Sequence, residues 1–353
     1  MGHKTLIGGT AYNISGGKSL VSGTSYSISS GKTLIGGTAY NINLKKNVPT
    51  AMLYNDGNFV FQHGSKIASG KTLTASYTGF EEVNYNAETS IPWTSYKNNI
   101  KTVSFNNEIS PIGITRWFNY ACNLTSFNKT NLNIDSIIYM NTAFQNCQKV
   151  KMTPFCGANV VSMDYAFWNC RNMTGSPVCG NNVVNMSRAY FNCVNITGIC
   201  ACGNNVTNMA YAYYRCGKVN GGTVGNNVID MAYVFYNCSN FSQVPIVGSN
   251  VVNMAYAYYN CFHSKTGNIY IYSPNVTNMI NCIYRASPHR INIYVPAGST
   301  TNKTIHNANK FDASLDGWSI TWTKNSTCSY STIRNIYIYP VADVDAARKK
   351  NGQ

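Results

Sequence analysis

The sequence predicts an α/β repeat protein, a solenoid of coils about 23 residues long in which each coil is a short helix followed by a short strand. Three observations support this fold class. Only 11% of the residues are charged, against about a quarter in ordinary soluble domains. The chain also contains two internal periods, one of 14 residues near the N-terminus and one of 22 to 25 residues in the centre.

The shorter period lies in residues 1–48, where "KTLIGGTAYNISGG" is followed by "KSLVSGTSYSISSG" and "KTLIGGTAYNI". Each unit contains two β-prone runs separated by glycine-containing turns. So small a segment holds too little apolar mass to fold alone. We therefore expect it to order in an assembly, as an attachment segment through which the chain forms a homo-oligomer. The residues that recur in it are Lys4, Tyr12, Lys18, Tyr26, Lys32 and Tyr40.

The longer period occupies residues 116–290 and is marked by methionine and cysteine. Seven methionines are spaced 23, 23, 23, 22, 23 and 25 residues apart, and a cysteine follows each of the first six after seven residues. One such period cannot bury its own apolar face, but stacked copies can. The methionines are Met140, Met163, Met186, Met209, Met231, Met254 and Met279, and the cysteines are Cys147, Cys170, Cys193, Cys216, Cys238 and Cys261.

The stretch from each methionine to its cysteine has helical spacing. Met254, Ala257, Tyr258 and Cys261 fall at i, i+3, i+4 and i+7, which is one face of a helix. The residues before the methionines favour helix N-caps, and β-prone pieces such as "ITGICAC" (196–202) and "FSQVPIV" (241–247) follow the cysteines. The predicted N-caps are Ser162, Asn185, Asn208, Asp230, Asn253 and Asn278.

Repeats of the form "NVxNMxxAFxNCxxLTG" resemble the BspA-like leucine-rich repeats of bacterial surface and phage proteins. The resemblance implies a leucine-rich-repeat-like solenoid and an adhesive or structural role, without a chemistry. Valine, tyrosine or cysteine often replaces the usual leucines here.

The flanks resemble the β-rich segments that enclose such arrays. "AMLYNDGNFVFQHG", "GKTLTASYTGFEE" and "SIPWTSYKNNIKTVSF" imply an N-terminal cap over 49–115, and "INIYVPAGSTTN", "GWSITWT" and "NIYIYP" imply a C-terminal cap over 291–340. A charged tail is expected over 341–353. The 14-residue repeats look like segments near the N-termini of phage virion proteins.

The thirteen cysteines favour a reduced packing ladder, because cysteine is often buried as a small apolar residue. Successive coils would also bring cysteines within bridging distance, so disulfides after release stay an alternative. The "CAC" at 200–202 is a weak metal signal without a histidine cluster. We expect no metal and no cofactor.

Catalysis has little support. Asp135, Asp164 and Asp230 are the only acids between 116 and 296, and the five histidines, His3, His63, His263, His289 and His306, are scattered. Glu81, Glu82 and Glu88 could supply a carboxylate pair for glycoside cleavage. We expect solvated loop acids instead, and no enzyme.

An outward-facing stripe is predicted at two and five residues past each methionine. Its aromatic rings could stack on sugars or contact a protein, or they could pack on one another along the stack. The candidate ligand-binding residues are Tyr165, Trp168, Arg188, Phe191, Tyr211, Tyr214, Tyr233, Tyr236, Tyr256 and Tyr259.

The net charge of +15 favours polyanionic partners, although no motif for specific nucleic-acid binding accompanies it. No apolar run is long enough to insert into a membrane. "MGHKTLIGGT" lacks the features of a secretory signal, which favours synthesis in a host cytoplasm and release by lysis.

We therefore expect a non-enzymatic phage virion protein, a fibre, tail or head-surface component, at the virion surface. Its partners would be other virion proteins and a host surface glycan or teichoic acid. The alternatives are a fibre-borne glycan depolymerase and an adhesin on a bacterial cell surface.

Overall fold

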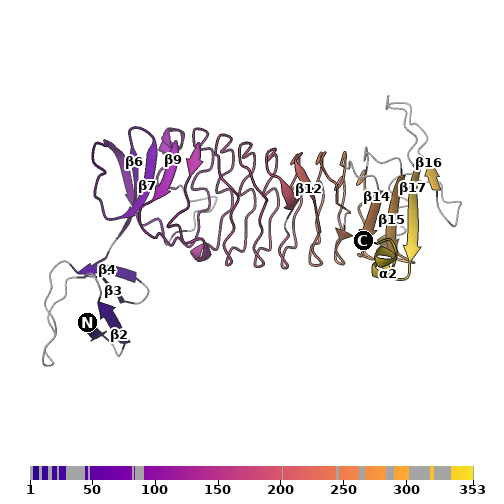
Figure 1. The fold of residues 1–353 in the computed structure, drawn as a ribbon, viewed down its shortest axis with the longest axis horizontal. Helices are drawn as coiled ribbons and strands as arrows, with labels where there is room; N and C mark the ends of the chain where they lie inside the picture. The colour runs from indigo at the N-terminus through magenta and orange to yellow at the C-terminus, as the bar shows by residue number, and fades with distance from the viewer. Residues whose placement is uncertain are drawn as a thin grey trace.

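A computed structural model describes residues 48–81, 83, 91–200, 202–243, 246–261, 267–283, 290–301, 319–321 and 335–352, together with the backbone of five strands between residues 3 and 46. Coils are stacked in a single row, and a β-sheet closes each end of the row (Figure 1).

The first two units of the 14-residue repeat are antiparallel hairpins with the same register. Lys4 faces Asn13 in the first hairpin, as Lys18 faces Ser27 in the second. Both β-prone runs predicted for these units are thus strands, while the third unit lies outside the described residues. The five strands of this segment are β1 (His3–Ile7), β2 (Thr10–Ile14), β3 (Lys18–Val21), β4 (Thr24–Ile28) and β5 (Leu44–Lys46).

A five-stranded sheet, in the order β10-β9-β7-β6-β8, starts the coil stack. β6, β7 and β8 pair antiparallel, whereas β9 pairs parallel with β7 and β10 parallel with β9. The sheet therefore changes from antiparallel pairing around β6 to the parallel pairing that the coils continue. Its strands are β6 (Pro49–Tyr54), β7 (Asn58–His63), β8 (Leu73–Thr78), β9 (Thr102–Phe105) and β10 (Ser126–Phe127), and the 3-10 helix η1 (Thr94–Asn99) precedes β9.

Buried aromatic rings join this sheet to the first coil. The rings of Phe61 and Trp117 are stacked with centroids 5.1 Å apart. Trp93 donates its indole N–H to the carbonyl oxygen of Trp117 at 2.7 Å, so this polar group is satisfied inside the core. The strand and the coil therefore share one core.

The stretch from methionine to cysteine is a series of tight turns, and the helix predicted for each coil is wrong. In the copy at Met209, every second N–H donates to the carbonyl three residues back, as from Tyr214 to Tyr211 at 3.1 Å. The N–H groups between them donate to the next coil, as from Tyr213 to Val234 at 3.0 Å. An α-helix would send all of these donors to the carbonyl four residues back within its own chain segment.

Residues with a left-handed backbone also exclude a helix. Tyr211 has φ 59° and Arg215, four residues later, has φ 58°. Most coils place asparagine at the second of these positions, and asparagine tolerates this conformation better than other non-glycine residues. The α-helix α2 (Val344–Lys350) lies outside the coils. The fold is a β-rich stack of turns and parallel bridges, and not an α/β solenoid of the leucine-rich-repeat kind.

The four-residue turns explain why the sequence resembled a helix. Met254, Ala257, Tyr258 and Cys261 are all buried, as the helical face required. A chain of such turns buries the residues 0, 3, 4 and 7 positions after the methionine, as a helix does. The predicted burial pattern was therefore right, and the predicted helical backbone was wrong.

Five of the six residues predicted as N-caps accept the expected hydrogen bond, but they cap turns, whereas the Ser162 hydroxyl donates to the Asn141 carboxamide oxygen at 2.6 Å. The Asn208 carboxamide oxygen accepts from the N–H of Ala210, two residues on, at 3.0 Å, and Asp230 does the same for Ala232 at 2.9 Å. This is an Asx turn. The same positions form consecutive parallel bridges between coils, through Ser162, Asn185, Asn208, Asp230, Asn253 and Asn278.

Two of the strands in the coils lie where the sequence predicts them, after the cysteines. Gly198–Cys200 falls within 196–202, and Ile246–Val247 falls within 241–247. The remaining short elements of the coils complete the set: η2 (Ile134–Ser136), β11 (Gly198–Cys200), β12 (Val219–Gly222) and β13 (Ile246–Val247).

A column of buried aromatic rings fills the interior, four residues after each of the first six methionines and, in the first coil, four residues after Ile114. Consecutive rings are stacked with centroids 5.3 to 5.7 Å apart. The column comprises Phe118, Phe144, Phe167, Tyr190, Tyr213, Phe235 and Tyr258.

A column of buried thiols lies beside the rings. Cys193 donates its thiol to the carbonyl oxygen of Phe167 in the preceding coil, with the sulfur 2.9 Å from the oxygen, and the other five methionine-linked cysteines donate to the equivalent carbonyls. All twelve cysteines in the described part of the chain are free. The six methionine-linked cysteines are buried and free, as predicted for the ladder, whereas Cys122 is exposed.

A second sheet, in the order β13-β14-β15-β17-β16, ends the stack. Its first four strands pair parallel, and β16 pairs antiparallel with β17. The segment expected as a charged tail contains α2, which is capped by Asp343 and is held to the sheet by a 2.9 Å hydrogen bond from the Tyr272 hydroxyl to Asp345. The strands added here are β14 (Gly267–Ile271), β15 (Arg290–Pro296), β16 (Ser319–Thr321) and β17 (Asn335–Val341).

Glycines six residues before several methionines lie where neighbouring coils approach closely. A Cβ added to Gly203 would lie 2.2 Å from the carbonyl oxygen of Gly180, and one on Gly248 would lie 2.1 Å from that of Gly225. Only a hydrogen atom fits there, so these glycines set the distance between coils at this corner.

We predict that Gly203→Ala destabilises the protein by about 1–3 kcal/mol, because the methyl group collides with a backbone carbonyl that side-chain movement cannot relieve. Gly225→Ala is the matched control, since its added Cβ would meet the Cys202 sulfur at 3.3 Å and the Gly203 oxygen at 3.6 Å. Denaturant unfolding of both variants measures the difference. Equal losses of stability would contradict the close approach at Gly203.

Candidate binding surface

The residues predicted as a binding stripe form two columns that run along the coil stack, here called the tyrosine face. All ten side chains are half-buried. The first column, two residues after the methionines, comprises Tyr165, Arg188, Tyr211, Tyr233 and Tyr256. The second column, five residues after the methionines, comprises Trp168, Phe191, Tyr214, Tyr236 and Tyr259.

Rings within each column are stacked face to face. In the first column, Tyr233 lies 4.5 Å from both Tyr211 and Tyr256, with ring planes within 8°. In the second, successive centroids from Phe191 onward lie 4.4, 4.7 and 4.5 Å apart. The spacing is close to the ~4.8 Å between paired strands, so backbone pairing sets the stacking distance.

Arg188 takes the place of a ring in the first column. Its guanidinium lies 5.1 Å from the ring centroid of Tyr165 and 4.7 Å from that of Tyr211. A planar cation between two ring faces is attracted to both. The column therefore continues through this coil, and a positive charge is held on the tyrosine face.

Stacking determines what a ligand can reach. Each ring face inside a column is covered by the neighbouring coil, and the two columns also contact one another, as at Tyr211 and Tyr214 with centroids 5.8 Å apart. A ligand meets ring edges and hydroxyl groups, while sugar stacking on ring faces is restricted to the ends of the columns. The interpretation in which the rings pack on one another describes this geometry.

Two tyrosine hydroxyls of the face, those of Tyr233 and Tyr236, stay protonated. Burial raises the pKa of Tyr233, and the neighbouring phenol of Tyr211 adds to the effect. Burial also raises the pKa of Tyr236, with a further contribution from Tyr259. These groups are therefore neutral at physiological pH and do not reduce the positive charge of the face.

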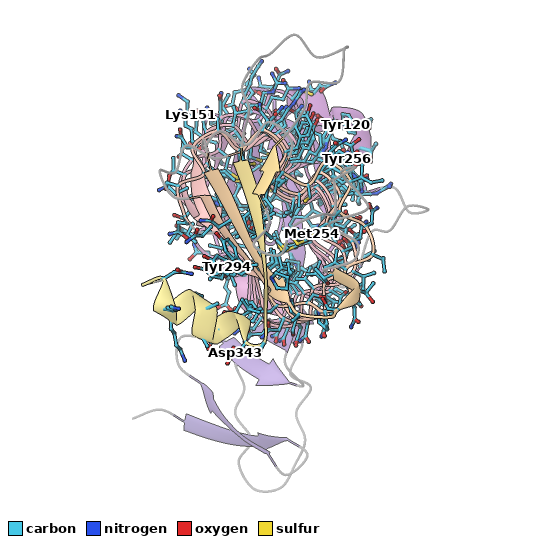
Figure 2. The ribbon with its side chains drawn as sticks, turned by 90° about the vertical axis from the view of Figure 1, so that its right-hand side faces the viewer. Tyr120, Lys151, Met254, Tyr256, Tyr294 and Asp343 are labelled. Carbon is cyan, nitrogen blue, oxygen red and sulfur yellow. The ribbon has the colours of Figure 1, made fainter. Side chains whose placement is uncertain are left out.

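A column of asparagines borders the second column, six residues after the methionines. The Asn169 amide donates to the Asn146 carboxamide oxygen at 2.8 Å, and Asn260 donates to Asn237 at 2.9 Å. The amides thus bond mainly along the column. Tyr120, which holds this position in the first coil, lies on the same side of the stack as Tyr256, whereas Lys151 lies on the other side (Figure 2).

Four exposed cations lie just beyond the second column, six to nine residues after the methionines, and are here called the basic ridge. Their partners are amides and a ring: the Lys149 ammonium donates to the Asn123 carboxamide oxygen at 2.9 Å, and the Arg215 guanidinium lies 5.5 Å from the Tyr214 ring. The ion pairs found among the described residues are Lys71–Asp56 and Lys349–Asp345, and neither involves these cations. The ridge consists of Lys149, Arg171, Arg215 and Lys218.

A further column, two residues before the methionines, was not predicted from the sequence; its side chains are exposed or half-buried. Each N–H there donates to the preceding coil, as from Val184 to Val161 at 2.9 Å, and Val184 and Ile229 are 46% and 50% exposed. The signal was the adjacent pair in "NVVNM", because consecutive residues of an extended chain point to opposite sides. The column comprises Ile112, Ile138, Val161, Val184, Thr207, Ile229, Val252 and Thr277.

The acids of the sequence have local roles where they are described. Glu81 accepts a hydrogen bond from the N–H of Ser110 at 3.0 Å, while Glu82 and Glu88 lie outside the described residues. Asp135 accepts from the N–H of Ala158 at 3.0 Å. Burial raises the pKa of Asp164, and the Arg188 charge opposes that shift.

No group of three or more histidine, cysteine or acidic side chains in the described part of the chain is placed to hold a metal ion. Over the same residues, no helix has the length and apolar character to cross a membrane. Of the proposed attachment residues, Lys4, Tyr12, Lys18 and Tyr26 lie in strands β1 to β4, and Lys32 and Tyr40 fall outside the described residues.

The chain matches no protein-family model, no curated protein and no solved structure. The resemblance to BspA-like repeats therefore stays a prediction from the motif, and function has to be argued from the surface itself.

We predict that the ladder thiols are protected from alkylation in the folded protein at mildly alkaline pH. Burial raises the pKa of Cys193 to about 12, so its reactive thiolate is scarce, whereas Cys122 is exposed. Mass spectrometry after brief iodoacetamide treatment should find Cys122 labelled first, and all thirteen cysteines labelled after unfolding. Rapid labelling of Cys193 in folded protein would contradict its burial.

The raised pKa of Cys193 in the folded protein also predicts that the free energy of unfolding falls as pH rises from about 9 towards 12.

We also predict that Tyr233→Ala destabilises the coils by about 2 kcal/mol or more, since it removes two stacked contacts worth about 0.5–1.5 kcal/mol each besides the lost burial. Tyr233→Phe keeps the ring and should change stability far less. Thermal unfolding of the two variants, followed by circular dichroism, provides the measurement. A Tyr233→Ala protein as stable as the parent would mean that stacking in the columns contributes little.

Proposed function

We propose that this chain is a non-enzymatic structural and adhesion protein of a phage virion, in which the coil stack presents repeated weak sites to the host envelope. The observation that carries the proposal is the tyrosine face, on which the same kinds of side chain recur once per coil at spacings of 4.4 to 4.7 Å.

Regular spacing suits a ligand that is itself repetitive. Each contact with an exposed ring edge, hydroxyl or cation is weak on its own. When one contact of a polymer is made, the next becomes intramolecular, and overall binding rises with the effective concentration. A rigid stack keeps these groups aligned without ordering them at each encounter.

In this proposal the N-terminal hairpins have a separate role, in attachment to other virion proteins and in oligomerisation. Two copies of one hairpin with the same register, β1–β2 and β3–β4, form a modular segment. The motif resemblance and the 14-residue repeats are the support for a virion setting. The same surface on a bacterial cell would serve a surface adhesin.

The described residues favour adhesion over the depolymerase alternative. Glycoside cleavage uses two carboxyl groups about 5–10 Å apart on either side of the scissile bond. Glu81, the one candidate of the three that is described, accepts a hydrogen bond from the backbone of Ser110 and so has a structural role there.

We predict that changing six tyrosines of the face to phenylalanine lowers binding to host cells by about tenfold or more, because many weak contacts are lost together while the stacked rings remain. Binding of labelled protein to cells is measured by flow cytometry, with circular dichroism to verify the fold. The half-buried Tyr139, outside the tyrosine face, provides the control Tyr139→Phe. The six positions are Tyr211, Tyr214, Tyr233, Tyr236, Tyr256 and Tyr259.

Undiminished binding by the sixfold variant would remove the tyrosine face from the proposal. If the parent protein binds no host cells even at low ionic strength, the adhesion role is wrong and a structural role in the particle is left.

A further inference from the structure

Hydrogen bonds within the asparagine column and the basic ridge decide which polar groups are left for a ligand. Along the asparagine column, amides bond to one another, as Asn169 does to Asn146 at 2.8 Å. Asparagines also accept from the ridge cations, as Asn195 does from Lys218 at 2.7 Å and Asn169 from Arg171 at 3.0 Å. The amide acceptors are thus largely used, while guanidinium and ammonium groups keep further donors.

A ligand suited to this arrangement is rich in acceptors and poor in donors. Lysine carries three donors and arginine five, with no acceptor on either. The protonated hydroxyls of Tyr233 and Tyr236 add neutral polar groups between the two columns and solvent. Phosphodiester oxygens accept hydrogen bonds and donate none, and arginine matches them with its planar fork.

All the charged side chains at the basic ridge are positive. The acids of the coils, Asp135, Asp164 and Asp230, lie five residues before, one residue after and one residue before a methionine, away from the ridge positions. Lys149 and Lys218 are three coils apart, which corresponds to roughly 14 Å at a spacing of ~4.8 Å per coil. An anion at a single point cannot bridge them, but an extended polyanion can.

We propose that the basic ridge binds a linear phosphodiester polymer of the cell envelope, lying along the coil stack beside the second column. This inference rests on the adhesion role proposed above and specifies its ligand. Neutral sugars find the ring faces covered, so the selectivity comes from charge. The polymer's repeated phosphates engage successive ridge cations, and its polyol or sugar units contact the ring edges.

Electrostatic contacts of this kind weaken as salt rises, because exposed charges are screened within about 8–10 Å at physiological ionic strength. Binding should therefore be multivalent, low in affinity per phosphate and strongly salt-dependent. A polymer of several phosphates should bind far better than inorganic phosphate, which occupies one cation at a time.

The test uses the full chain, with poly(glycerol phosphate) as the probe and isothermal titration calorimetry at low and physiological ionic strength as the measurement. The ridge variant carries Lys149→Gln, Arg171→Gln, Arg215→Gln and Lys218→Gln. A control removes the same number of positive charges from exposed lysines outside the ridge, with Lys66→Gln, Lys101→Gln, Lys129→Gln and Lys151→Gln. Circular dichroism of both variants verifies that they are folded.

We expect the ridge variant to lose about tenfold or more in affinity and much of its salt dependence, and the control to bind nearly as the parent does. Equal losses in both variants would overturn the inference, because net charge alone would then explain binding. Equal affinity for hyaluronate, a carboxylate polymer, would overturn the choice of phosphodiester. Preferential binding of single-stranded DNA, which is also a phosphodiester polymer, would overturn the assignment to a polymer of the cell envelope.

The two proposals fail separately. If the parent binds host cells but not poly(glycerol phosphate), the ligand assignment is wrong and adhesion stands. If it binds the polymer through the ridge but no host cells, the ridge is a phosphodiester site and the adhesion role is wrong.

Discussion

The backbone hydrogen bonds between consecutive coils are the constraint on which the rest of this structure depends. Every second N–H in the methionine-to-cysteine stretch donates to the next coil, as from Tyr211 to Ala232 at 2.8 Å. Because these bonds join residues 21 to 25 positions apart, they place equivalent side chains above one another. Unpaired backbone groups would be costly inside such a stack, so a slip of register in one coil would disturb its neighbours as well.

The same register produces columns inside and outside the stack. Inside, ring faces such as those of Tyr190 and Tyr213 lie 5.5 Å apart, and each ladder thiol donates to a carbonyl of the coil before it. Outside, the half-buried rings stack more closely, at 4.5 Å for Tyr233 and Tyr256. The residues of the first column have positive φ, 57° at Tyr233, a conformation unfavourable for a bulky residue. Hydrogen bonds to the neighbouring coils and ring stacking on both sides hold Tyr233 in this conformation.

Stacking also limits how this surface can work. Rings that cover one another give stability to the coils and leave only edges and polar groups for a ligand, so the aromatic character of the face is used largely within the protein. The cations beside it are bonded to amides such as Asn123 and Asn195 and pair with no acid in the described part of the chain, which leaves their charge uncompensated there. Repetition of these features along a rigid axis allows individually weak contacts to act together.

The sequence by itself determined the period, the inward positions and the outward stripe. Met254, Ala257, Tyr258 and Cys261 are buried as their spacing required, and the thiols are free wherever they are described. The strands of the first two 14-residue units and the strand pieces after the cysteines were likewise readable from local β-propensity and glycine turns.

Only the tertiary structure decided the backbone conformation of each coil and which parts of the stripe's rings face solvent. A helix and a chain of four-residue turns bury the same positions, so the pattern could not separate them. The choice was made by hydrogen bonds to the neighbouring coil, which no single period contains. Whether Tyr211 shows its face or its edge to solvent depends on Tyr233, 22 residues later, at 4.5 Å. Local sequence fixes which side of the coil a residue occupies, while contacts between coils decide what that side offers to a ligand.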